Sequence, residues 1–245
     1  MKIALVTGAS SGIGAAAAIL FAENGYTVVA TGRNQERLDA VKAKAPEQIH
    51  TIACDLNSAA TCETLIADVA AQFGQLDVLV NSAGIITRHT VPDTTDEDWR
   101  QTMTVNLDVP FYLSRAAIGH LTKTKGRIIN VASYWGVRGG GRALAYTASK
   151  AGLIGLTKAM ALDHAAEGIT VNAVCPGDVV TPMLEREIES LGLKYDDAIK
   201  DWHADYPTGR VTEAAEVAAM ILYLASDAAR QVTGQALLID GGASV

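Results

Sequence analysis

The sequence predicts an α/β protein built on a doubly wound, seven-stranded parallel sheet with helices on both faces. Short runs rich in Val, Ile and Leu alternate with longer stretches that carry apolar residues at helical spacing. These short runs lack the in/out alternation of half-exposed strands, which is typical of parallel strands covered on both faces. Strict alternation implies right-handed crossovers, and no linker or repeat divides the 245 residues, so a single domain is expected.

The elements follow one another in a regular order along the chain. The strand candidates are 2–7, 27–31, 49–53, 76–81, 127–132, 170–175 and 236–239. The helix candidates are 13–24, 35–44, 59–73, 95–123, 145–167 and 213–226. Pro110 lies inside the fourth helical stretch and predicts two helices or a kink near Val109, because proline removes a backbone donor.

Two connections are longer than a compact α/β domain usually needs. Segment 134–143 holds four glycines, and 177–210 is a long insertion with an expected helix around 184–190. The insertion follows the C-terminal end of a predicted strand, where open α/β sheets bind their ligands. We therefore expect residues 178–210 to form a substrate loop or lid.

Composition excludes several classes of protein. A net charge of −7 argues against binding to nucleic acid or to an anionic membrane. No run approaches the roughly 18 uncharged apolar residues of a membrane span, and the N-terminus resembles a first strand rather than a signal peptide. Cys54, Cys62 and Cys175 form no CxxC pair and the histidines are scattered singly, so we expect reduced thiols, no metal site and a cytoplasmic location.

A glycine-rich segment joins the first predicted strand to the first predicted helix. Its glycines let the backbone approach a pyrophosphate, and the helix N-terminus supplies N–H groups. A plain tight turn is the alternative, but the strand–turn–helix setting favours a dinucleotide site. The residues expected at the phosphates are Gly8, Ser10, Ser11, Gly12, Ile13 and Gly14.

The end of the second predicted strand indicates which dinucleotide binds. An NAD site typically has an acidic residue there to accept hydrogen bonds from the ribose. This chain has Gly32, Arg33 and Asn34 instead, which removes the carboxylate that repels a 2′-phosphate and adds a cationic fork. The sequence therefore predicts NADP(H), with Arg33 and Asn34 in its site.

Further cofactor contacts are expected after the third and fourth predicted strands. Asp55, followed by Leu56, suits the adenine amino group, although a helix cap is an equal reading of Asp55. Asn81, Ala83 and Gly84 end the fourth strand with mostly small residues, as packing against the adenosine ribose requires.

Three residues predict proton-transfer chemistry. Ser133 ends the fifth predicted strand, while Tyr146 and Lys150 lie one turn apart on the next helix. A free tyrosine titrates near pH 10, and a lysine ammonium with a positive nicotinamide ring would lower that pKa enough for a general acid/base. A Tyr-x-x-x-Lys pair alone is typical of any amphipathic helix. After a phosphate-binding segment and a strand-end serine, it favours catalysis.

These motifs together resemble the short-chain dehydrogenase/reductase family over essentially the whole chain. The resemblance rests on 7–14, 81–84, Asn106, Ser133, 146–150 and 176–177. It implies a Rossmann-type fold and a tetrad in which Asn106 carries a water that links Lys150 to solvent. It further implies that the nicotinamide is lined by Pro176, Gly177, Val179 and Thr181. Ser82 departs from the usual second Asn of the family, beside the adenosine.

The leading interpretation is an NADP(H)-dependent oxidoreductase acting on a small or medium secondary alcohol or ketone, of sugar, polyol or cyclic or aliphatic type. The residues expected at the substrate are Ser133, Trp135, Tyr146 and Met183. The alternatives are a 3-oxoacyl-[acyl-carrier-protein] reductase, a catalytically silent NADP-sensing regulator and a sugar-nucleotide epimerase. An epimerase needs a larger C-terminal region than this chain provides. The resemblance and the apolar helices 95–123 and 145–167 predict a homo-oligomer, expected to be a tetramer.

Overall fold

The computed structural model describes residues 1–245 except for the side chain of Asp205. Seven parallel strands form one sheet in the order β3-β2-β1-β4-β5-β6-β9, which confirms the predicted doubly wound fold. The strands are β1 Ile3–Thr7, β2 Thr27–Gly32, β3 Ile49–Ala53, β4 Val78–Asn81, β5 Arg127–Val131, β6 Thr170–Pro176 and β9 Ala236–Ile239. Their bounds differ from the predicted ones by at most two residues at either end.

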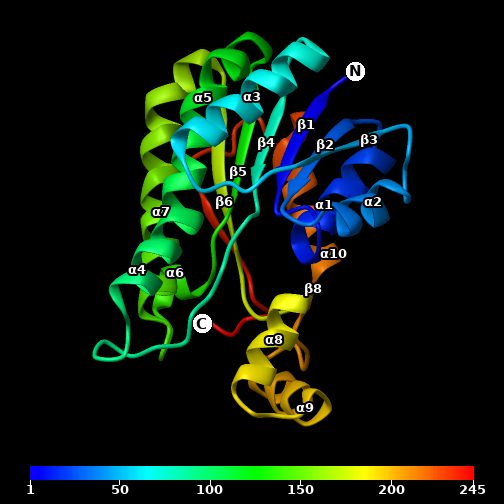
Figure 1. Cartoon of the computed structure of the whole chain (residues 1–245). Coiled ribbons are helices and arrows are strands. Elements are labelled where there is room, and N and C mark those ends of the chain that lie inside the picture. The colour runs from blue at the N-terminus through cyan, green and yellow to red at the C-terminus, as the bar shows by residue number, and fades with distance from the viewer.

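Helices cover both faces of the sheet (Figure 1). The helices α1 Gly12–Glu23, α2 Gln35–Lys42 and α10 Ala214–Ala225 lie on one face, and α3 Ala59–Phe73, α5 Val109–Thr124 and α7 Leu144–His164 lie on the other. Alternate residues of β1 serve the two layers: Ala4 and Val6 pack with α1 and α10, whereas Ile3 and Leu5 pack with α3 and α5. Because both faces are buried, the strands carry continuous apolar runs.

The fourth helical stretch is interrupted, as Pro110 predicts. Helix α4 (Asp96–Met103) is followed by a π-helical segment, Thr104–Asp108, and then by α5, which has Pro110 in its first turn. Proline has no N–H to donate to the preceding turn, and the turn that precedes Pro110 is π-helical rather than α-helical. Short π-helical segments are frequent at functional sites, and this one contains Asn106.

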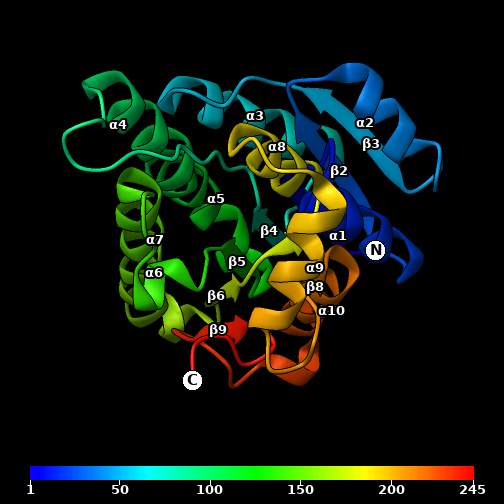
Figure 2. The same cartoon turned by 90° about the horizontal axis from the view of Figure 1, so that it is seen from below.

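The long insertion contains more regular structure than the sequence predicts. Helices α8 (Pro182–Ser190) and α9 (Tyr195–Asp205) lie beyond the carboxyl ends of the strands (Figure 2). Strands β7 (Val179–Val180) and β8 (Thr212–Glu213) pair in parallel and tie the two ends of the insertion together. Segment 134–143, expected to be a loop, begins with the short helix α6 (Trp135–Arg138).

The topology creates a crevice at the carboxyl edge of the sheet. The chain proceeds outward from β1 to β2 and β3 on one side, and from β4 to β9 on the other. The connections that leave β1 and β4 therefore diverge and leave a crevice between them. This crevice is the usual ligand site of such sheets. In the described part of the chain, no helix is long and apolar enough to span a membrane.

Candidate active site

A cavity of about 850 Å³ occupies this crevice. It runs from the segment after β1, past the end of β2, to the ends of β5 and β6. Most of the residues predicted for the site line it, namely Gly8, Ser10, Ser11, Gly12, Ile13, Gly14, Arg33, Asp55, Leu56, Ala83, Gly84, Ser133, Trp135, Tyr146, Lys150, Pro176, Gly177, Val179, Thr181 and Met183. Asn34, Asn81 and Asn106 are not among the residues that line it.

The glycine-rich segment forms a cradle that fits a pyrophosphate. Gly8 has φ +65°, and a Cβ there would lie 2.8 Å from the backbone of Ala83. A Cβ at Gly14 would overlap the carbonyl of Gly8, so the turn requires glycine at both positions. Ser11 is the N-cap of α1 but makes no side-chain capping bond, so the N–H groups of the first turn keep their capacity for an anion. The cradle therefore fits a dinucleotide phosphate.

The end of β2 carries two arginines rather than one. Arg33 and Arg37 both line the cavity beside Gly32. Asn34 does not line the cavity, and its side chain caps α2 by accepting a hydrogen bond from the backbone N–H of Arg37 at 2.8 Å. Sequence reasoning missed Arg37, although its place one turn after Asn34 in the helix could have identified it.

Asp55 lies in the cavity wall and does not cap a helix. The cap of α3 is Ser58, whose hydroxyl accepts from the N–H of Thr61 at 3.3 Å. Asp55 instead accepts a hydrogen bond from the Asn57 side chain at 3.2 Å, and Leu56 follows it with 9% of its surface exposed. The structure therefore does not support the helix-cap alternative for Asp55, and the contact with the adenine stays a prediction.

Asn81 was expected at the cofactor, but its side chain is buried and bonded to the neighbouring strand β5. Its amide donates to Asn130 at 2.8 Å, and the amide of Asn130 donates to Thr157 at 2.8 Å. Only the residues that follow reach the cavity. The hydroxyl of Thr7 accepts from the N–H groups of Ser82 and Ala83 at 3.0 and 3.1 Å, which fixes this segment beside the glycine cradle.

Asn106 braces the connection that follows β4. Its side chain accepts from the N–H of Ile85 at 2.9 Å, donates to the Ile85 carbonyl at 2.9 Å and donates to Ser149 at 3.0 Å. The residue is fully buried, which is why its side chain does not line the cavity. A Cβ at Gly84 would lie 3.4 Å from Oδ1 of Asn106 and 3.5 Å from Nζ of Lys150, so these groups converge on one point.

Ser133, Tyr146 and Lys150 meet at the far end of the cavity. The ammonium of Lys150 donates to the Val131 carbonyl at 2.8 Å and lies 5.6 Å from the centroid of the Tyr146 ring. The hydroxyl of Ser133 accepts from the N–H of Trp135 at 3.2 Å and lies near the phenol of Tyr146, where its hydrogen bond opposes the rise in the tyrosine's pKa. The ring of Trp135 packs edge-on against the Tyr146 ring, with centroids 6.0 Å apart.

Burial controls the proton affinities of this group. It raises the pKa of Tyr146 to about 12 and lowers the pKa of Lys150 to about 8. Lys150 alone does not produce the expected lowering of the phenol's pKa. Burial of Tyr146 raises that pKa, and burial of Lys150 lowers the lysine's own pKa, so that its ammonium form is less favoured. The phenol is therefore protonated at neutral pH, the form that a proton donor requires.

Cys175 does not behave as a nucleophile. It is fully buried at the end of β6, and burial raises the pKa of its thiol to about 11. A thiol with so high a pKa carries almost no thiolate at neutral pH. Among the described residues, no group of three or more His, Cys, Asp or Glu side chains is arranged to hold a metal ion.

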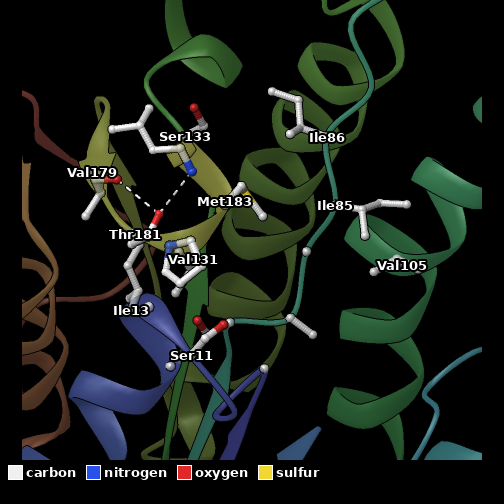
Figure 3. Close-up of a pocket in the computed structure, with 18 of the residues that line it drawn as sticks. Ser11, Ile13, Ile85, Ile86, Val105, Val131, Ser133, Val179, Thr181 and Met183 are labelled. Carbon is white, nitrogen blue, oxygen red and sulfur yellow. Dashed lines mark hydrogen bonds between the residues drawn. The ribbon is translucent and has the colours of Figure 1, made fainter. Parts of the chain in front are cut away.

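The predicted nicotinamide residues gather where α8 begins. Thr181 caps α8 by accepting from the N–H of Leu184 at 3.4 Å, and it donates to the Val179 carbonyl at 3.0 Å. In the view of Figure 3, Ile13, Val131 and Thr181 lie on one side of the cavity, and Ile85, Ile86 and Val105 lie on the other.

Besides Arg37, the sequence analysis missed further charged residues of the cavity wall, among them Arg88, Asp178 and Glu187. These three come from the connection after β4, the end of β6 and helix α8. Nothing in the spacing of the sequence connects them, because only the fold brings these three segments together. Asp178 was the most accessible to prediction, since it directly follows the Pro176-Gly177 pair.

Comparisons with known proteins agree with this geometry. Residues 8–244 match a family model described as enoyl-(acyl carrier protein) reductase. A 3β-hydroxysteroid dehydrogenase of Mediterraneibacter gnavus is 40% identical over 98% of this chain and 94% of its own. A 3-oxoacyl-[acyl-carrier-protein] reductase of Thermotoga maritima is 38% identical over 98% of this chain and 97% of its own. The crystal structure of a variant of actinorhodin polyketide ketoreductase with NADPH superposes with a TM-score of 0.93, at 37% identity over 99% of this chain and 97% of that one.

The fold and the site thus define an oxidoreductase of alcohol and ketone groups. The chain belongs to the short-chain dehydrogenase/reductase family, as the matches over nearly its whole length show.

Proposed function

We propose that this protein transfers a hydride between NADP(H) and a small or medium secondary alcohol or ketone, with Tyr146 as the general acid/base. The observation that carries the proposal is one continuous cavity with an uncapped, glycine-rich helix N-terminus at one end and Ser133, Tyr146 and Lys150 at the other. A cavity of this kind suits a dinucleotide that reaches from the phosphate cradle to the proton donor.

Several residues would hold the cofactor. The N-terminus of α1 suits the pyrophosphate, Asp55 suits the adenine, and Lys150 lies where the nicotinamide ribose is expected. When bound, the nicotinamide supplies the hydride for reduction or accepts it in oxidation. The preference for NADP(H) is supported by Gly32, which brings no carboxylate, and by Arg33 and Arg37 beside it.

In ketone reduction, the chain's own residues handle the proton. The hydroxyl of Ser133 would hold the carbonyl oxygen of the substrate, and the phenol of Tyr146 would donate its proton to that oxygen. The raised pKa of Tyr146 keeps this proton in place until the substrate needs it. Lys150 would then favour the phenolate that remains, because its ammonium lies one helical turn away.

The test is NADPH oxidation with a panel of ketones by wild type and by Tyr146→Phe. The substitution keeps the buried ring but removes the proton donor, so turnover should fall by about 10²- to 10⁴-fold while NADPH still binds. Tyr223→Phe is the matched control, because Tyr223 lies on α10 with 45% of its surface exposed and does not line the cavity. Near-normal turnover of Tyr146→Phe would contradict the proposed acid/base.

A second candidate is a 3-oxoacyl-[acyl-carrier-protein] reductase, which the Thermotoga maritima relative favours. The net charge of −7 and Glu167, which lies at the end of the α7 segment, oppose docking of an acidic carrier. An acetoacetyl thioester on the carrier, compared with the same thioester on a small thiol, separates the two functions. A carrier-bound substrate preferred by more than about tenfold would favour this second candidate. NADPH binding without turnover of either would indicate a cofactor-sensing regulator.

A further inference from the structure

Arg88 is held inside the substrate end of the cavity. Its guanidinium stacks on the ring of Trp135, with the central carbon 4.3 Å from the ring centroid, and it donates to the Gly141 carbonyl at 3.1 Å. Its side chain is 20% exposed. The Nε–H group is buried and has no hydrogen-bond partner among the described residues. Since buried donors are normally paired, this group has hydrogen-bonding capacity left for a ligand.

Glu187 pairs with Arg88 from helix α8. The two side chains form an ion pair between the connection after β4 and helix α8. The side chain of Glu187 is 7% exposed. One carboxylate oxygen binds Arg88, and no hydrogen bond from the described residues reaches the other oxygen. This second oxygen is therefore an unused acceptor in the cavity wall.

Asp178 supplies a second carboxylate to the lining of the same cavity. The hydroxyl of Tyr206 donates to it at 2.9 Å and accepts from its backbone N–H at 2.6 Å, which fixes its position. Burial raises the pKa of Asp178, while Tyr206, Arg88 and Tyr134 act in the opposite direction. We call Arg88, Asp178 and Glu187 the charged wall; they line the same cavity as Ser133 and Tyr146, and the charges of Arg88 and Asp178 act on the phenol of Tyr146.

We propose that the charged wall selects neutral, polyhydroxylated substrates, with Arg88, Asp178 and Glu187 as hydrogen-bond partners of hydroxyl groups near the reacting carbon. This inference rests on the proposed function and narrows its substrate class to sugars and polyols and the corresponding hydroxyketones. The carboxylates can accept hydrogen bonds from substrate hydroxyls, and the guanidinium can donate to them. Water makes these hydrogen bonds when no substrate is bound. Trp135, Ile86 and Met183 would contact the carbon skeleton on the remaining side.

Other substrate classes fit the charged wall less well. A wholly apolar ketone would displace water from ionised groups without replacing its hydrogen bonds, which is unfavourable. An anionic substrate would meet an arginine that Glu187 already neutralises and that Asp178 also faces. Arg186 lines the cavity as well, but its side chain is exposed, and solvent screens its charge.

The experiment compares ketones that differ only in their hydroxyl groups. With NADPH in excess, kcat/KM is measured for 2-butanone, 1-hydroxy-2-butanone and erythrulose, which carry none, one and three hydroxyls on the same four carbons. 2-Decalone represents a larger apolar ketone. We expect kcat/KM to rise with each step of the series and to be at least about tenfold higher for erythrulose than for 2-butanone. The wild-type series tests the substrate preference, and the variants below test whether the charged wall causes it.

Variants of the charged wall assign the preference to its residues. Glu187→Gln and Asp178→Asn keep shape but remove charge, and each should lower the ratio of erythrulose to 2-butanone by about tenfold. Glu185→Gln is the matched control, because it makes the same change on the same helix at an exposed residue outside the cavity. Its ratio should equal that of wild type.

Two outcomes would overturn the inference and leave the proposed function standing. One is turnover of 2-butanone or 2-decalone as efficient as that of erythrulose. The other is an unchanged substrate ratio in both Glu187→Gln and Asp178→Asn. NADPH that is consumed with none of these ketones, nor with any of the wider panel, would instead overturn the proposed function and the inference with it.

Discussion

Replacing Lys150 with methionine should make the cofactor-free protein more stable at pH 7. Lys150 is 4% exposed, and burial lowers its pKa from 10.5 to about 8. Each pKa unit corresponds to about 1.4 kcal/mol, so keeping the ammonium charged in the folded state costs about 3 kcal/mol. Methionine removes this cost but also the hydrogen bond to the Val131 carbonyl, which is worth about 1 kcal/mol. The net gain in the free energy of unfolding should be about 2 kcal/mol.

The pH dependence gives this prediction a distinctive sign. Because the folded-state pKa of Lys150 lies below its unfolded value, the unfolded chain binds more protons between about pH 8 and pH 10.5. The free energy of unfolding of wild type therefore increases as the pH rises through that window. Below the window, the buried ammonium of Lys150 destabilises the folded state to its full extent. The advantage of Lys150→Met should be largest near pH 7 and should vanish or reverse near pH 10.5.

Urea unfolding followed by circular dichroism measures the effect, with both proteins at one concentration so that any assembly contributes equally. Saturating NADPH should reduce the advantage if Lys150 contacts the nicotinamide ribose as proposed, because the variant lacks that contact. Lower stability of Lys150→Met at pH 7, or a difference from wild type that does not change between pH 7 and pH 10, would refute the reasoning.

Three further predictions concern charge, cofactor and assembly. Lys150→Arg keeps the positive charge but changes its reach and hydrogen-bond geometry, so kcat should stay close to that of Lys150→Ala rather than wild type; steady-state rates with a fixed ketone test this. Gly32→Asp combined with Arg33→Ala should reverse the preference for NADPH over NADH, which we expect to be about 1–3 kcal/mol in wild type, and equal use of both cofactors by wild type would argue against the assignment. Sedimentation at micromolar concentration should show a homo-oligomer, expected to be a tetramer, because α5 and α7 present Phe111 and Leu162 with 40% and 84% of their surfaces exposed; a monomer alone would contradict this.

The sheet was predictable because each buried strand carries its own signal. A continuous apolar run such as 170–175 predicts a buried strand without any information about the neighbouring strands. The structure extends that strand by only one residue, to Pro176. The strands β7 and β8 were not predictable, since each has two residues and exists only because Val179–Val180 pairs with Thr212–Glu213. Helix α9 was missed because it lies within a polar segment that was expected to be a loop or lid.

The residues of the site also divide into those that local motifs predict and those that only the fold brings together. The glycine segment and the Tyr146–Lys150 pair are local motifs, and the structure brings them to one cavity. Asn34 and Asn81 were predicted from their positions at strand ends, but a backbone N–H and a neighbouring strand engage their side chains. The pKa of Tyr146 was predicted from charge alone, whereas burial, which a sequence does not show, decides its direction. The charged wall depends on three distant segments.

The π-helical segment Thr104–Asp108 places a constraint on how this chain can vary in length. An α-helix turns about 100° per residue, so the one extra residue of a π-turn rotates everything that follows by about that angle. The buried face of α5 (Val109, Leu113, Ala117 and Leu121) is therefore rotated about the helix axis relative to where a continuous α-helix from α4 would place it. A deletion of one residue here would turn that face from the sheet and move Asn106 from Ile85. Within this stretch, the number of residues matters to the enzyme at least as much as their identity.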